Sequence, residues 1–189
     1  MNYKLSAVGD DGIDWDKHWQ EHSSDSNFHD VKTFDYFRNL LPENFDVLDL
    51  GCGSCKWYPA FKKAGARRYV GVDFSPVAVS LAKKKFHEVE VYLMKVEDIS
   101  FHEEFDLVFT HTFLQHTKLK TKEKIIPKIW KALKPSGIFV IQEKCDVKTE
   151  TTFTREGWID FIVPYGFIYI TSTPESDPRN GFVFKKVIK

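Results

Sequence analysis

Short apolar runs alternate with amphipathic segments along the middle of the chain. The runs have the length of strands and lie at residues 47–50, 68–72, 89–96, 106–110 and 138–141. The segments between them have apolar residues at helical spacing and lie at about 55–64, from Ser75 onward and at 119–133. This alternation predicts an α/β fold, because parallel strands need helical crossovers that cover both faces of the sheet.

The last part of the chain follows a different order. A helical segment at 154–163 leads to an apolar run at 166–170, and a polar loop separates this run from another at 182–188. No helix lies between these two late strands, so we expect them to pair antiparallel as a hairpin.

The first part of the chain is polar before it becomes helical. Residues 1–13 are rich in Gly and Asp, and we expect them to be loose. Trp15, His18 and Trp19 then stand at i, i+3 and i+4, which predicts a helix. A second helix is predicted over 30–41, with one apolar face and an end at Pro42. That face would carry Val31, Phe34, Phe37 and Leu41.

Composition narrows the class of protein. The 189 residues fit one domain, which we divide into an N-terminal segment (1–29) and a core (30–189). Lys plus Arg and Asp plus Glu both total 27, so the balanced charge makes a nucleic-acid partner unlikely. The basic stretches 83–85 and 118–124 are interpreted as solvated helix faces.

Cysteine count and hydropathy indicate a cytoplasmic protein without a membrane partner. Three cysteines are too few for a disulfide framework. No apolar run reaches the roughly 18 residues of a membrane span, and the N-terminus lacks the pattern of a signal peptide. Cys52 and Cys55 form a C-x-x-C spacing, but no further ligands accompany them, so we expect no metal.

The most informative stretch is the apolar run 47–50 followed by Gly51-Cys52-Gly53-Ser54. A glycine turn after a strand lets a ligand approach the backbone, although this pattern alone serves several nucleotide ligands. The dinucleotide fingerprint would need glycine at Lys56. Two acids, Asp49 inside the strand and Asp73 at the end of the next one, add carboxylates that can accept hydrogen bonds from ribose hydroxyls.

Four motifs in this order resemble the Rossmann-like (class I) S-adenosylmethionine-dependent methyltransferases. They are residues 47–53, residues 70–75, residues 105–109 with Leu114-Gln115-His116, and residues 133–137. The resemblance covers residues 30–189 and implies a mostly parallel seven-stranded sheet with an antiparallel last strand. It also implies S-adenosylmethionine as the cofactor.

The resemblance implies a role for each matching position. Gly51, Cys52 and Gly53 would pass under the methionine part of the cofactor, with Asp49 organising that loop or the amino group. Asp73 would hold the ribose, with Phe74 against the adenine and Val96 and Glu97 at the adenine edge. Thr110 and His111 would line the methyl-donor end.

Two positions depart from the family pattern. Many members have a third glycine where this chain has Cys55, so we expect a tighter or shifted loop. Many also have Asp at the position of Lys95, so the adenine amino group would need Glu97 or Asp98 as its acceptor.

Methyl transfer from a sulfonium is an in-line displacement, which needs a base only if the acceptor must lose a proton. His111 and His116 are the candidate bases, since they follow the fourth apolar run at the edge where ligands of such folds bind. The alternative to a catalytic role for His116 is a structural one, in which its side chain holds the local backbone in place.

The N-terminal segment is a candidate lid. Trp15 and Trp19, with Phe28 and His29 after them, would supply aromatic walls to an acceptor pocket that His111 also faces. The alternative is that both tryptophans pack a terminal helix on the sheet.

The favoured function is methyl transfer to a small-molecule acceptor. The alternatives are a methyltransferase acting on protein or nucleic acid, and a binding protein that kept the fold without catalysis. The sequence leaves the acceptor, the methylated atom and the oligomeric state open.

Overall fold

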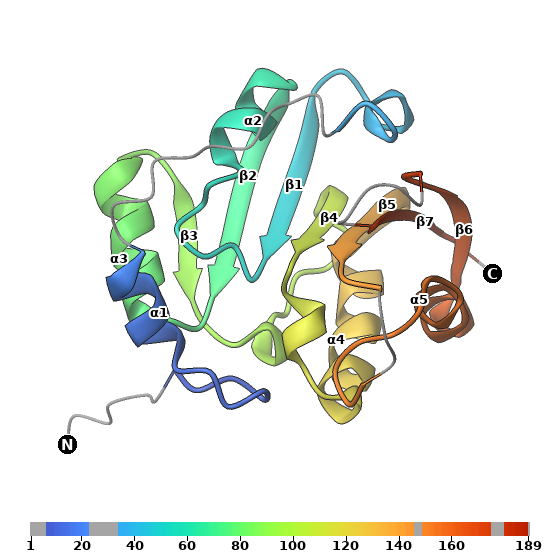
Figure 1. The fold of residues 1–189 in the computed structure, drawn as a ribbon. Coiled ribbons are helices and arrows are strands. Elements are labelled where there is room, and N and C mark those ends of the chain that lie inside the picture. The colour runs from blue at the N-terminus through green and yellow to red at the C-terminus, as the bar shows by residue number, and fades with distance from the viewer. Residues whose placement is uncertain (1–6, 23–33, 146–148, 175–179, 189) are drawn as a thin grey trace.

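A computed structural model describes residues 7–22, 34–145, 149–174 and 180–188 (Figure 1). In these residues seven strands form one sheet with the order β3-β2-β1-β4-β5-β7-β6. The strands are β1 (Phe45–Leu50), β2 (Ala66–Asp73), β3 (Glu90–Leu93), β4 (Phe105–His111), β5 (Leu133–Glu143), β6 (Phe167–Ser172) and β7 (Asn180–Lys186). Phe28, His29 and Val31 lie outside the described residues.

The strand directions confirm the predicted topology. β1 to β5 pair in parallel, whereas β7 pairs antiparallel with both of its neighbours, β5 and β6. β7 is thus the last strand in the chain and the one antiparallel strand of the described sheet. The antiparallel pairing of β6 with β7 confirms the predicted hairpin.

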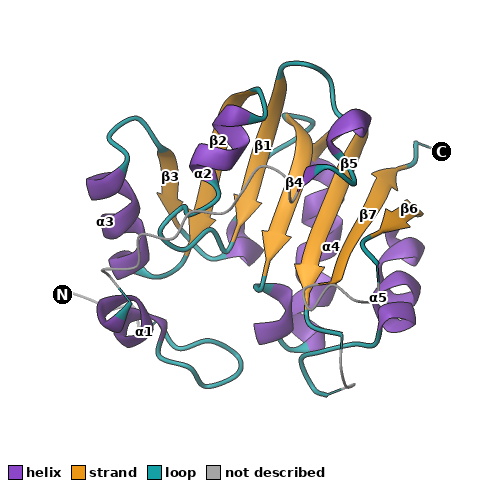
Figure 2. Cartoon of the chain, turned by 45° about the horizontal axis from the view of Figure 1, so that its top comes forward, coloured by secondary structure: helices purple, strands orange, loops and turns teal. Residues whose placement is uncertain are grey.

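Helices cover both faces of the sheet, as the alternating pattern predicts (Figure 2). They are α1 (Trp15–Glu21), α2 (Tyr58–Lys63), α3 (Pro76–Lys85), α4 (Leu119–Ala132) and α5 (Arg155–Ile162), with 3-10 turns η2 (Arg38–Leu40), η3 (Val96–Asp98), η4 (Leu114–His116) and η5 (Val163–Tyr165). Side chains of α2 and α3 join one buried cluster, and those of α4 and α5 join a second. The two clusters lie on opposite faces because successive strand residues point to opposite sides.

Two predicted helices are shorter or differ in type. The helix expected over 55–64 begins only at Tyr58, because Cys55 has a φ of 57°, which an α-helix does not allow. The described part of 30–41 forms turns and η2 instead of an α-helix. Arg38 donates from its guanidinium to the carbonyls of Ala64 and Glu43, which ties η2 to the end of α2 and to the segment before β1.

The ends of several strands also differ from the predicted ones. The strand expected over 89–96 ends at Leu93, because Met94 N–H bonds to Asp73 O and the chain then turns into η3. β5 begins at Leu133 and ends at Glu143, longer than the predicted 138–141, with an irregular register opposite Phe105–Leu107. β4 includes His111, which the sequence pattern left just beyond the strand.

The described part of the N-terminal segment is ordered, contrary to our expectation for residues 1–13. Val8 and Asp14 form an antiparallel bridge, and Gly9 N–H donates to Ile13 O at 2.9 Å. The Asp14 side chain then caps α1 by accepting from Lys17 N–H at 3.1 Å. Backbone pairing therefore folds residues 7–14 into a closed turn.

One interpretation of the basic stretches is wrong. Lys83–Lys85 are exposed as expected, but Lys122 is fully buried. Its ammonium group donates to the carbonyls of Thr117 and Thr151, and burial lowers its pKa to about 8. This lysine fastens α4 to the loop before α5. In the part of the chain that the structure describes, no helix combines the length and apolar character that a membrane span needs.

Candidate functional site

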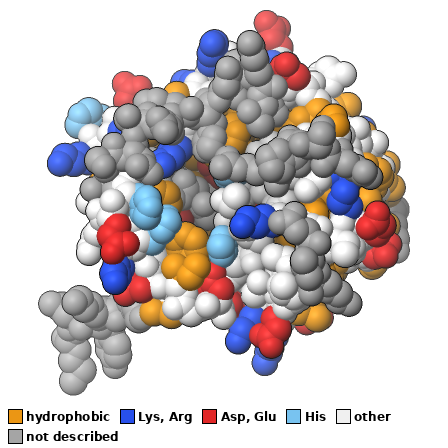
Figure 3. All heavy atoms as spheres, viewed as in Figure 1, with side chains coloured by type: hydrophobic (Ala, Val, Ile, Leu, Met, Phe, Trp, Pro, Cys, Tyr) orange, Lys and Arg blue, Asp and Glu red, His pale blue; other side chains and the backbone are white. Residues whose placement is uncertain are grey.

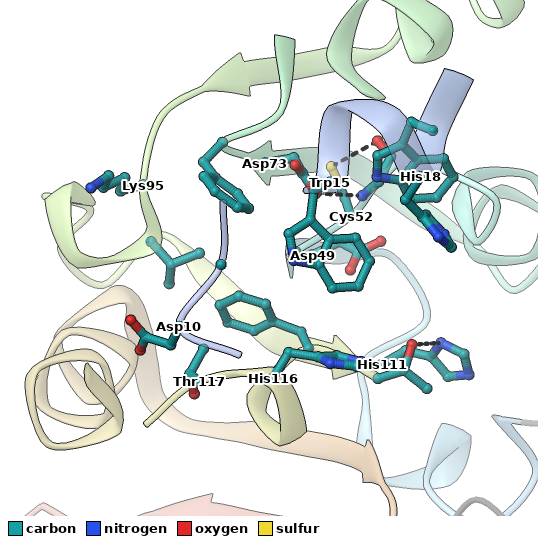
Figure 4. A pocket seen from close by; sticks show the side chains of 18 of the residues that line it. Asp10, Trp15, His18, Asp49, Cys52, Asp73, Lys95, His111, His116 and Thr117 are labelled. Atoms are coloured by element: carbon teal, nitrogen blue, oxygen red, sulfur yellow. Dashed lines mark hydrogen bonds between the residues drawn. The ribbon is translucent and has the colours of Figure 1, made fainter. Parts of the chain in front are cut away.

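A cavity of about 540 Å³ opens at the carboxyl ends of β1, β2 and β4 (Figure 4). Parallel strands place these ends at one edge of the sheet, which is where ligands of open α/β folds bind. Residues of α1, the glycine turn, the loop before η3 and the turn carrying η4 line it. Its size is that of a small-molecule site.

The glycine turn closes tightly on neighbouring aromatic side chains. Gly51 and Gly53 have φ values of 69° and 54°, a region that favours glycine. A Cβ at Gly51 would come within 2.5 Å of Phe113, and one at Gly53 within 2.2 Å of Trp19. Both positions therefore need glycine for conformation and for space.

Cys55 keeps the backbone conformation that a third glycine would adopt. Its φ of 57° lies in the left-handed region, and its sulfur lies 3.7 Å from that of Cys52. Both thiols pack on Gly71, where a Cβ would come within 2.8 Å of Cys52 Sγ. Burial raises the pKa of Cys52, so this thiol is protonated and contributes to packing rather than acting as a thiolate. Cys52 also lines the cavity.

Asp73 holds the turn from the next strand. Its carboxylate accepts from Gly53 N–H and Ser75 N–H, each at 2.9 Å. Burial raises its pKa to about 6, while these N–H groups act in the opposite direction. Asp49 lies beneath, where the Tyr69 hydroxyl donates to it at 2.6 Å. Burial raises the pKa of Asp49 to about 7, and the charge of Asp73 adds to the shift.

Some of the other predicted cofactor positions line the cavity, and one does not. Phe74, Val96 and Glu97 line the cavity, as does Lys95, whose ammonium group points away from Asp73 in Figure 4. Thr110 does not line the cavity, contrary to the expectation that it faces the methyl-donor end. It is fully buried, and its hydroxyl donates to Glu143 at 3.3 Å, because strand alternation turns its side chain away from the cavity.

Both candidate histidines line the cavity. His111, at the end of β4, lies with its ring 5.1 Å from the ring of Trp57 and its Nδ1 3.3 Å from the Thr112 hydroxyl. His116, in η4, has its Nδ1 2.7 Å from a carboxylate oxygen of Asp11. The second histidine is therefore tied to the N-terminal segment.

Residues 7–21, which we call the N-terminal strap, cross the cavity and are fastened on both sides. On one side the hydroxyl of Ser75 donates to Asp16 at 2.6 Å. On the other, Lys118 N–H donates to Asp10 at 2.9 Å, next to the Asp11–His116 pair. Trp15 and Trp19 line the cavity and no residue of α1 is buried, which favours the prediction of a lid over that of a helix packed on the sheet.

Sequence reasoning missed Glu143, which positions η4. This fully buried carboxylate at the end of β5 accepts from the N–H groups of Phe113, Leu114 and Gln115, at 3.2, 2.9 and 3.1 Å. Burial raises its pKa to about 7. An acid two residues after the fifth apolar run was the available signal. The lining residues that the sequence analysis did not assign to a site include His18, His22, Lys56, Trp57 and Phe113.

The described residues contain no group of three or more His, Cys, Asp or Glu side chains arranged to hold a metal ion.

Comparisons with known proteins agree with this geometry. The family described as "Methyltransferase domain" matches residues 47–137. Phosphoethanolamine N-methyltransferase of Plasmodium falciparum is 28% identical over 159 residues, which are 78% of this chain and 56% of that protein. Ribosomal protein L11 methyltransferase of Thermosipho africanus is 32% identical over 116 residues, which are 60% of this chain and 43% of that protein.

A solved structure extends the comparison to the fold. An amino pentose methyltransferase from Micromonospora echinaspora, with S-adenosylmethionine bound, has a TM-score of 0.73, 15% identity, and coverage of 90% of this chain and 96% of its own. Fold, glycine turn and acidic strand end together are typical of α/β proteins that bind a nucleotide cofactor. Residues 47–137 match the methyltransferase-domain family, and the fold is that of the Rossmann-like, class I S-adenosylmethionine-dependent methyltransferases. The chain spans about half the length of the curated relatives it matches.

Proposed function

We propose that this protein transfers the methyl group of S-adenosylmethionine to a small-molecule acceptor. The observation that carries the acceptor class is the N-terminal strap, which is fastened to Ser75 on one side of the cavity and to His116 and Lys118 on the other. An acceptor has to fit under this strap and beside the cofactor in a cavity of about 540 Å³. A flat or extended polymer surface would meet the strap first.

The residues present fit the cofactor. The turn at Gly51 and Gly53 leaves backbone open toward the cavity for the methionine part, and the Asp73 carboxylate can accept from ribose hydroxyls. Phe74 and Val96 offer apolar surface for the adenine, with Glu97 as the acceptor for its amino group. When bound, S-adenosylmethionine supplies an electrophilic methyl group on a positively charged sulfur.

The protein's own contribution is alignment, exclusion of water and removal of a proton. Trp15, Trp19 and Phe113 line the cavity. Their rings keep bulk water away from the displacement reaction, in which the positive charge on sulfur is lost. His111 faces the same space from the end of β4 and would accept the acceptor's proton. His116, paired with Asp11, is the second candidate base, and its bond to the strap favours a role in closure.

The first test is thermal unfolding with S-adenosylmethionine, S-adenosylhomocysteine, NAD or buffer. Ligand at a hundred times its Kd stabilises by about 2.7 kcal/mol, which is roughly a 5–10 °C rise in Tm for a domain of this size. We expect that rise with the two adenosyl ligands and none with NAD. No shift with either adenosyl ligand would favour a binding protein that kept the fold without catalysis.

His111→Ala separates catalysis from cofactor binding. We expect turnover of an acceptor found by screening to fall by about 10²–10⁴-fold, since a positioned base contributes that much. The Kd for S-adenosylhomocysteine should stay within about twofold of wild type. His102→Ala, an exposed histidine that does not line the cavity, is the matched control, and equal turnover of the His111 variant would remove its assignment as base.

Methylation of protein is the second candidate, because relatives include enzymes named for ribosomal protein L11. Transfer of labelled methyl groups distinguishes the two. Label that stays with macromolecules after gel filtration of a treated extract favours a protein or nucleic-acid acceptor, and label in the small-molecule fraction favours our proposal.

A further inference from the structure

His116, which lines the cavity, is bonded at both of its ring nitrogens. Its Nδ1 lies 2.7 Å from a carboxylate oxygen of Asp11 in the N-terminal strap, and its Nε2 lies 3.2 Å from the amide nitrogen of Gln115. Trp15 of the strap packs edge-on against His116 and against His18, with ring centroids 5.0 and 5.1 Å away. Figure 3 shows histidine side chains on both sides of a hydrophobic patch on this face of the molecule.

The orientation of the Gln115 amide is fixed by the end of β5. Its side-chain oxygen accepts from Lys144 N–H at 2.9 Å, while the backbone N–H of Gln115 donates to Glu143 at 3.1 Å. A backbone N–H can bond only to the oxygen of the amide, so the amide nitrogen has to face His116. An amide nitrogen donates and does not accept, and the Nε2 of His116 is therefore the acceptor and carries no proton.

The proton of neutral His116 then lies on Nδ1, where Asp11 accepts it as a hydrogen bond. The other carboxylate oxygen of Asp11 accepts from Ile13 N–H at 3.1 Å, which ties the carboxylate to the turn of the strap. A series of hydrogen bonds thus joins the end of β5 to the strap through Gln115, His116 and Asp11. Both ring nitrogens of His116 are engaged in this closed arrangement.

Resting on the proposed function, we infer that Gln115 and Asp11 are positioning residues that hold His116 as an Nδ1–H donor. His116 then fastens the strap over the acceptor, and His111 is the base that accepts the acceptor's proton. Trp15 lines the cavity and contacts the His116 ring, so the same hydrogen bonds place one wall of the acceptor site. His116 therefore acts on acceptor binding and not on proton transfer.

NMR of the imidazole nitrogens tests the tautomer in the full chain, without any acceptor or cofactor. The ¹⁵N-labelled protein would be measured at about pH 8, where an ordinary histidine is neutral. The signals of His116 are those that disappear in His116→Asn. We expect a proton on Nδ1 and an unprotonated Nε2. A wild-type spectrum with the proton on Nε2 would overturn the inference.

Gln115→Glu tests whether the amide sets this tautomer. A carboxylate only accepts hydrogen bonds, so the Nε2 of His116 should take up a proton when it faces one. Gln20→Glu makes the same chemical change at an exposed position of α1 that does not line the cavity, and it should leave the His116 signals unchanged. An unprotonated Nε2 in Gln115→Glu would show that the amide has no such role.

Steady-state kinetics with an acceptor found by screening separates fastening of the strap from proton transfer. Asparagine keeps an N–H donor near the position of Nδ1 but cannot act as a base, so His116→Asn should retain kcat within about fivefold. His116→Ala also loses the donor, and we expect the acceptor KM to rise on the order of tenfold with kcat little changed. A fall in kcat of about 10²-fold or more in both variants is the effect of a missing base and would overturn the inference.

Failure of this inference can be told apart from failure of the proposed function. A wild-type protein that binds no S-adenosylhomocysteine would remove the proposed function, whatever the tautomer of His116. A proton on Nε2 in a protein that binds S-adenosylhomocysteine would remove only the roles of Gln115 and Asp11.

Discussion

The two halves of the cavity are built in different ways. The half with Gly51, Gly53 and Asp73 belongs to the sheet edge, where buried backbone and a nearly buried carboxylate hold each other. The other half takes His18 and Trp19 from α1, in which no residue is buried, and His22 from the position directly after that helix. The first half is fixed by the core, whereas the second depends on a strap fastened by a few polar contacts.

Under the proposed function, this difference separates cofactor binding from acceptor binding within one cavity. Cofactor binding needs the same geometry in every turnover and uses positions locked by strands. Acceptor binding needs entry and release, and segments with few buried contacts open most readily. Variants that damage one half should therefore leave the other measurably intact.

Gly53→Ala should give the largest effect. The left-handed backbone costs roughly 1–2 kcal/mol with a Cβ, and that Cβ would meet Trp19 at 2.2 Å. We expect the Kd for S-adenosylhomocysteine, measured by calorimetry, to rise more than about 100-fold. Gly12→Ala has a similar φ of 81° with nothing within 4 Å, so it isolates strain and should retain binding. Equal losses in both variants would argue against close packing as the cause.

Asp73→Asn should weaken cofactor binding less. The amide keeps the shape but loses a charged acceptor, worth about 1.5–3 kcal/mol, which is roughly 10–100-fold in Kd. Asp106→Asn, at the opposite end of the sheet where Lys134 pairs with it, should bind normally. An Asp73 variant with wild-type affinity would contradict its assignment to the ribose.

Glu143→Gln should change how stability depends on pH. Burial raises the pKa of Glu143 from 4.5 to about 7, so its contribution to stability is complete below about pH 4.5 and is lost as pH rises through about 7. The Tm of wild type minus that of Glu143→Gln should therefore fall between pH 5 and pH 8, by on the order of 5 °C. Glu88→Gln, at an exposed position, serves as control. If the Tm difference between wild type and Glu143→Gln stayed constant with pH, the pKa of this carboxyl would be the same in the folded and unfolded protein.

Asp16→Asn should have the smallest effect. It removes the charged acceptor for the Ser75 hydroxyl, which fastens one side of the strap, and a hydrogen bond contributes about 0.5–1 kcal/mol net. We expect a two- to fivefold faster release of S-adenosylhomocysteine in stopped flow, with stability unchanged. Glu21→Gln, which breaks the outward Lys17–Glu21 pair on the same helix, is the control. Similar release from wild type and Asp16→Asn would leave the strap without a role in closure.

Local rules account for the parts that the sequence analysis predicted well. The alternation of strand-like and helix-like spacing predicted the order of strands and helices, and the polar loop between the last two apolar runs predicted the hairpin. Strand ends of a parallel sheet share one edge, so Gly51, Asp73 and His111 could be brought together without a structure. Thr110 was misplaced because strand alternation near the end of β4 sends neighbouring side chains in opposite directions.

The sequence by itself determined the α/β topology, the glycine turn and its acidic partner. These features depend on the spacing of apolar residues, the residue types in turns and the direction of neighbouring strands, all of which can be recognised in short stretches of sequence. Only the tertiary structure decided that Cys55 takes the place of a glycine, that Glu143 holds η4, and that His18, His22 and Lys56 line the same cavity. These features join segments far apart in the chain, as in the pairing of Asp11 with His116. Such contacts follow from how whole elements pack, which no local pattern encodes.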